Sequence, residues 1–160
     1  MKKEIGYKII EITERIFGIE KKEIDLGSVE ELIIQERYRE NFAITKVREK
    51  PEEWIIELVE RKERIPLELK GKEVVFNGYK DKIEIIDHTL QGKLVYLQFF
   101  RRKWKEKGGR ESYSNTYELH PEGMKATKEF GDFLKALPRQ ERDEFFCTFP
   151  NIRHIKQKDF

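Results

Sequence analysis

The apolar positions of the first forty residues recur at helical spacing. On one face of a first predicted helix lie four isoleucines: Ile5, Ile9, Ile12 and Ile16. Ser28 and Glu31 form the pattern of a capping box, in which the serine hydroxyl accepts a backbone N–H and the glutamate reaches back. A second helix is therefore expected to run to about Glu40. Such a narrow stripe is expected to pack on the rest of the fold, and a homodimer seam is the alternative.

From residue 42 the pattern changes to the alternation and β-branched content of strands. Strands are predicted at residues 42–47, 54–59, 74–76, 83–86, 94–100 and 112–119. Asn77-Gly78 is expected to end the third of these. Val95, Leu97 and Phe99 are expected to share one face of the fifth. A turn at Gly108-Gly109 would bring the last strand back as its partner, forming a hairpin.

Helical spacing returns beyond Pro121. One side of this helix carries Ala126, Phe130, Phe133, Leu134 and Leu137, and Pro138 ends it. A further short helix is expected at 139–146, followed by a loose polar tail. The predicted fold class is α+β, with N-terminal helices, antiparallel sheet and hairpins, and C-terminal helices.

Length and composition are consistent with one domain or with one domain and a small appendage. The 160 residues include 11 Phe, 6 Tyr and 2 Trp, which indicates a folded core although 40% of residues are charged. We expect a division into residues 1–64, 65–150 and the tail 151–160. No apolar run approaches the roughly 18 residues of a membrane span, and the N-terminus lacks the apolar core of a signal peptide, so no membrane association and a cytoplasmic location are expected.

Few residues point to catalysis or metal binding. Cys147 is the only cysteine, which excludes an internal disulfide, and its aromatic neighbours indicate burial. His88, His120 and His154 are scattered, so neither a metal site nor a cofactor is predicted. Asp87 and His88 are adjacent in a strand and should point to opposite faces, which argues against an acid–base pair. No nucleophile elbow, P-loop or dinucleotide fingerprint is present.

One stretch, residues 101–110, concentrates positive charge, with six basic residues against one acid, although the net charge of the chain is only +2. The candidate DNA-binding residues are Arg101, Arg102, Lys103, Trp104, Lys105, Lys107 and Arg110. A β-ribbon fits the major groove, and clustered Lys and Arg supply phosphate contacts. Trp104, Tyr113 and Tyr117 would add the aromatic surface that single-strand stacking requires. The alternative is a solvated hairpin with aromatic residues paired across its strands.

Around this stretch, residues 65–137 resemble the N-terminal region of bacterial insertion-sequence transposases of the Bacteroidetes type, in which this region is often a short separate upstream reading frame. The residues that carry the resemblance are Leu69-Lys70-Gly71-Lys72, Ile85-Ile86-Asp87, residues 92–97, Arg101-Arg102-Lys103-Trp104, Tyr117-Glu118-Leu119, residues 122–130 and Phe133-Leu134-Lys135. The order also resembles the zinc-ribbon region of larger transposases. Here residues 105–109 stand at the position of the zinc-binding thiolates, so no zinc site is expected in this stretch.

The resemblance implies a DNA-binding N-terminal or accessory component of a transposase that contacts element ends and docks on a separate catalytic subunit. The family's chemistry uses three metal-binding carboxylates on a ribonuclease-H-like fold, which this chain does not offer, so no enzymatic activity is expected. The alternatives are a protein-interaction or assembly module whose basic hairpin grips an acidic partner, and an unrecognised enzyme.

Overall fold

The computed structural model describes residues 31–160. The isoleucine stripe of the first predicted helix and Ser28 therefore lie outside the described residues. The second predicted helix is present at residues 31–33 and is interrupted at Ile34 and Gln35. It is followed by the short helix α3 (Glu36–Arg39), so helical structure ends where the sequence predicted, but after a break.

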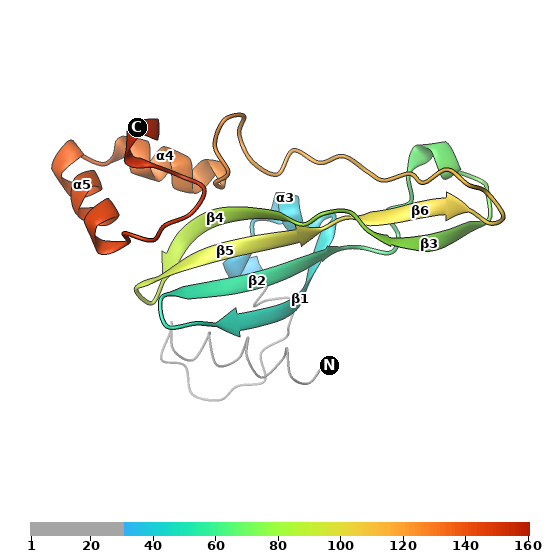
Figure 1. The fold of residues 1–160 in the computed structure, drawn as a ribbon, viewed down its shortest axis with the longest axis horizontal. Coiled ribbons are helices and arrows are strands. Elements are labelled where there is room, and N and C mark those ends of the chain that lie inside the picture. The colour runs from blue at the N-terminus through green and yellow to red at the C-terminus, as the bar shows by residue number, and fades with distance from the viewer. Residues whose placement is uncertain (1–30) are drawn as a thin grey trace.

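A four-stranded sheet forms the centre of the molecule (Figure 1). Its strands, in spatial order, are β1 (Phe42–Glu49), β2 (Glu53–Glu60), β5 (Lys93–Phe100) and β4 (Ile83–Leu90). The pairs β1–β2 and β4–β5 are antiparallel, whereas the central pair β2–β5 is parallel. The first two predicted strands and the strands at 83–86 and 94–100 are confirmed. The sheet takes β1 and β2 from residues 1–64 and the other two strands from residues 65–150.

A second, two-stranded sheet extends beyond one end of the first (Figure 1). We call it the ribbon; it consists of β3 (Val74–Tyr79) and β6 (Arg102–Glu106), which pair antiparallel. Since β3 leads into β4 and β5 leads into β6, the ribbon is the far half of one long hairpin. The chain enters it from β2 through a 3-10 turn at Leu67–Leu69.

Two expectations about strand pairing are wrong. Asn77-Gly78 does not end a strand; it lies within β3, where the register shifts between Phe76 and Tyr79 and Gly78 takes a φ of 81°. Residues 112–119 do not form a partner for β5. They contribute a single antiparallel bridge, between Tyr113 and Trp104. The partners of β5 are β2 and β4, so Gly108-Gly109 turns the chain at the tip of the ribbon instead of closing the predicted hairpin.

Both faces of the central sheet are covered, which explains why β5 is buried along almost its whole length. Val95, Leu97 and Phe99 share the face that also packs against Tyr38 of α3, as the alternation predicted. On the other face, Tyr96 belongs to a second cluster, together with side chains of the C-terminal segments.

The C-terminal helices α4 (Lys128–Ala136) and α5 (Arg139–Thr148) are present, but α4 begins at Lys128 and not directly beyond Pro121. Ala126, which was expected on this helix, instead pairs with Ile86 in a parallel β-bridge. The Thr127 hydroxyl caps α4 by accepting the Phe130 N–H. The tail is not loose, since Ile155 is buried and the backbone N–H of Arg153 donates to the Tyr96 hydroxyl at 3.0 Å. Cys147 is exposed, contrary to expectation, because it lies on the outer side of α5.

The α+β fold class is thus confirmed for the described part of the chain, which ends in helices and contains mostly antiparallel strands. Within residues 31–160, no helix has the length and apolar character needed to cross a membrane.

Candidate nucleic-acid interface

The basic stretch lies mainly on strand β6 of the ribbon. Because side chains alternate across a strand, Arg102 and Trp104 point to one face, and Lys103 and Lys105 point to the other. Trp104 lies opposite Phe76 of β3. The structure thus divides the stretch into an aromatic face that includes Arg102 and a lysine face.

Trp104 is part of the packing of the ribbon. It is 8% exposed, its ring meets that of Phe76 edge-on at 6.0 Å, and its backbone exchanges two hydrogen bonds with Tyr113. Tyr117 packs on the core residue Phe42, with ring centroids 5.0 Å apart. Of the three aromatic residues that the sequence marked for stacking, Trp104 is thus covered and Tyr117 packs on the core, whereas Tyr113 is half-buried and donates to Glu111.

Arg102 anchors the ribbon to the central sheet. Its backbone N–H donates to Glu60 Oε2 and its Nε donates to the Glu60 carbonyl, both at 2.7 Å. Glu60 is fully buried at the end of β2 and also accepts hydrogen bonds from Asn115 and Tyr117. Burial and the adjacent Glu60 carboxylate raise the pKa of Tyr117, so this hydroxyl stays protonated and remains a donor.

The other cations of the stretch differ in how far they are engaged. Lys107 pairs with Glu73 at 2.8 Å on the exposed tip of the ribbon, where an ion pair contributes little to stability. Within residues 31–160, no ion pair engages Lys103, Lys105 or Arg110. These three cations are thus available to a negatively charged ligand.

The sequence did not single out two exposed aromatic residues of the ribbon, Phe76 and Tyr79. They are 46% and 43% exposed, and their rings meet edge-on with centroids 5.1 Å apart. The Arg102 guanidinium lies over both rings, 5.2 and 5.6 Å from their centroids. The two rings lie beside Arg102 because β3 pairs with β6. No local sequence pattern predicted that pairing.

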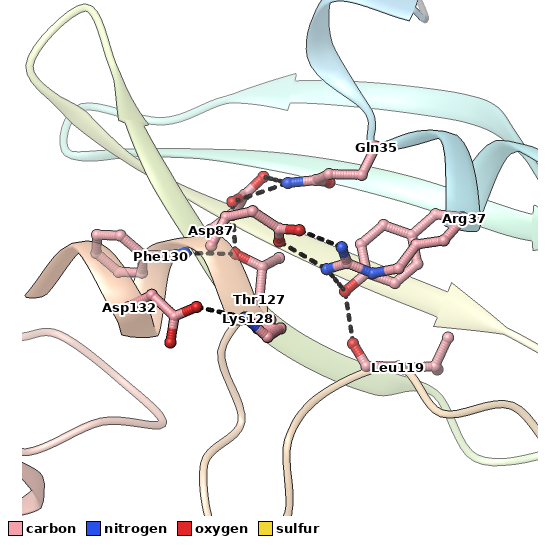
Figure 2. A network of polar contacts seen from close by, with 10 residues as sticks. Gln35, Arg37, Asp87, Leu119, Thr127, Lys128, Phe130 and Asp132 are labelled. Atoms are coloured by element: carbon pink, nitrogen blue, oxygen red, sulfur yellow. Dashed lines mark hydrogen bonds and ion pairs between the residues drawn. The ribbon is translucent and has the colours of Figure 1, made fainter. Parts of the chain in front are cut away.

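A separate polar network lies where α3 and α4 meet the sheet (Figure 2). The buried Asp87 carboxylate accepts from the Thr127 hydroxyl at 2.8 Å and from Gln35 Nε2. His88 is exposed and meets the Phe130 ring edge-on, and no hydrogen bond joins it to Asp87 among the described residues. Asp87 therefore connects the helices to the sheet.

Arg37 of α3 adds a second link to α4, through Glu129. The hydrogen bonds from Arg37 lower the pKa of Glu129 to about 2, although partial burial opposes that shift. Within the described residues, no three His, Cys, Asp or Glu side chains come together as a metal site. The ribbon, by contrast, combines cations that have no ion pair within residues 31–160 with exposed aromatic surface.

Comparisons with family models, curated proteins and solved structures find no match for this chain.

Proposed function

We propose that the ribbon binds DNA and that the protein acts as a DNA-binding N-terminal or accessory component of a transposase in the cytoplasm. The transposase assignment rests on the resemblance of residues 65–137. The observation that supports DNA binding is that Lys103 and Lys105 lie on one face of the ribbon, which extends beyond the sheet, and have no ion pair among the described residues.

The dimensions of the ribbon are consistent with a groove-binding element. Neighbouring strands lie about 4.8 Å apart, so two strands with their side chains fit a major groove about 12 Å wide. Lys107 and Arg110 at the tip would contact phosphates on either side of the groove. A contact of this kind is mainly electrostatic, because bound phosphates release their condensed counterions.

The lysine face can be tested by fluorescence anisotropy with duplex and single-stranded probes at several salt concentrations. Replacing Lys103 and Lys105 with alanine should lower affinity and flatten the log–log salt slope by up to about two units, at about 0.9 per phosphate. The matched control replaces Lys135 and Lys158, two exposed lysines outside the ribbon, and should behave as the wild type.

If the wild type binds neither probe more tightly than an unrelated protein of equal net charge, the DNA proposal fails. The cations of the ribbon would then be assigned to the alternative, an acidic protein partner. Equal loss of affinity in the control variant would also contradict the proposal, because the effect would then follow net charge and not the ribbon.

A further inference from the structure

We infer that Phe76 and Tyr79, on the face of the ribbon opposite Lys103 and Lys105, form a stacking platform for unpaired bases, so that the ribbon binds single-stranded or locally melted DNA in addition to duplex. This inference rests on the proposed function and specifies its ligand. Figure 1 shows the ribbon at the opposite end of the molecule from α4 and α5.

The exposure of these two rings is unusual among the aromatic side chains of the described strands. Most other large aromatic side chains of the strands, among them Phe42, Tyr96 and Phe99, are almost fully buried. Neither Phe76 nor Tyr79 belongs to the two clusters of the core. An adjacent exposed pair is apolar surface that folding leaves in water, and such surface commonly marks a binding site.

The rings are held in place before any ligand binds. Phe76 contacts Trp104, and Tyr79 meets Phe100 edge-on at 6.2 Å. Arg102, fixed to Glu60, occupies one side of both rings. The ring surface that remains exposed is therefore oriented by packing, and a base can stack on it without the cost of ordering mobile side chains.

The charge around the rings suits a nucleic-acid strand. Lys80 and Lys82, which follow Tyr79 on either side of Asp81, are exposed, and no ion pair engages either of them among residues 31–160. Arg102 adds a cation beneath the rings. Aromatic side chains that alternate with cations are the arrangement by which proteins bind single strands without sequence preference, since every base has a face that can stack.

The experiment compares three labelled probes: a mixed-sequence single strand of 12 nucleotides, an abasic strand of the same length, and the corresponding duplex. The wild type should bind the base-bearing strand at least about fivefold more tightly than the abasic strand, since stacking contributes about 5- to 150-fold per base. The variant F76L/Y79L should lose this preference and keep its affinity for the abasic strand.

The matched control is Phe133→Leu, which removes another aromatic side chain that is 46% exposed, on α4 outside the ribbon. It should retain the preference for the base-bearing strand. Circular dichroism and thermal melting report whether each variant folds. If F76L/Y79L does not fold, Tyr79→Leu replaces it, and the comparison of the two strands on the wild type requires no variant.

The outcomes separate the inference from the proposed function. Salt-dependent binding of the wild type that is equal for base-bearing and abasic strands would overturn the stacking platform and leave DNA binding intact. No binding to any probe would overturn both. A loss of preference in Phe133→Leu as large as in the ribbon variant would overturn the platform, because the rings of the ribbon would then not be its source.

Discussion

The buried carboxylate of Glu60 accepts the backbone N–H of Arg102 at 2.7 Å. Glu60 is the last residue of β2 and Arg102 is the first residue of β6, so this bond joins the central sheet to the ribbon. Asn115 and Tyr117 donate to the other carboxylate oxygen. One side chain therefore connects the sheet, the ribbon and the returning chain.

Removing this carboxylate should destabilise the protein strongly. Glu60→Ala removes a buried acceptor from the part-buried donors of Arg102, Asn115 and Tyr117, and we expect the free energy of unfolding to fall by about 3 kcal/mol. Urea denaturation measures the change. The control Glu63→Ala alters an exposed position and should stay within about 0.5 kcal/mol of the wild type. A comparable value for Glu60→Ala would show that the carboxylate does not stabilise the joint.

Neighbouring cations of the ribbon should differ in their effect on stability. Arg102→Ala removes the Nε hydrogen bond and the guanidinium over two rings, and should cost about 1–3 kcal/mol. Lys103→Ala, with no ion pair among the described residues, should change stability by less than about 0.5 kcal/mol. Thermal melting of both variants checks this, and equal melting temperatures would contradict the structural role of Arg102.

Glu84 should make the fold sensitive to acid. Burial raises the pKa of Glu84, but hydrogen bonds from Gln98, His154 and Arg153 outweigh it and hold the pKa at about 2, against an ordinary value of 4.5. Because the folded pKa is the lower one, this stabilisation is complete above pH 4.5 and is lost as the pH falls to 2. It amounts to up to about 3 kcal/mol.

We therefore expect Glu84→Gln to show a smaller loss of stability between pH 4.5 and 2 than the wild type, measured as urea midpoints across that range. Glu141→Gln, at an exposed position, serves as the control and should follow the wild-type curve. Parallel curves for Glu84→Gln and the wild type would show that another group governs the acid response.

The C-terminal tail should contribute to the core. Ile155→Ala removes a buried side chain from the cluster around Tyr96 and Phe130, and should cost about 2–5 kcal/mol. The neighbouring change Lys156→Ala, at an exposed position, should have little effect on the urea midpoint. If both variants unfold at the same urea concentration as the wild type, the tail does not pack as described.

Cys147 should react in the native protein, because it is exposed on α5. Ellman's reagent should modify it in the folded state at a rate within about tenfold of the rate in denaturant, since access and thiolate fraction control thiol reactivity. Reaction that begins only upon unfolding would instead support the buried cysteine expected from the sequence.

Local periodicity predicted most helices and strands. The errors concern which strands pair, because pairing depends on residues far apart in the sequence. The strand at 42–47 and the helix that follows Thr127 were readable because alternation and helical spacing are local properties. The strands that pair with residues 94–100 could not be predicted in the same way. Gly108-Gly109 favoured a return onto that strand, but β5 instead took β2 as a parallel neighbour, and no local signal marks such a pair.

The same limit applies to the candidate site. The sequence locates positive charge, because charge depends on composition alone, and Lys103 and Lys105 lie half-buried on one face of the ribbon. Which aromatic rings accompany that charge depends on the β3–β6 register. That register covers Trp104, which the sequence marked as a candidate for stacking, and exposes Phe76, which it did not mark.

The parallel pair β2–β5 also has a consequence for the order of folding. It places Ile56 beside Leu97, and the connection between the two strands contains β3, one strand of the ribbon, and β4. The hairpins β1–β2 and β4–β5 involve short loops and can close within about 10 μs, whereas the parallel seam must first overcome the entropy of closing a long connection. We therefore expect docking of the two hairpins to limit the refolding rate. Substitutions at Ile56 should slow it, while the surface of the ribbon can change with little effect on how fast the protein folds.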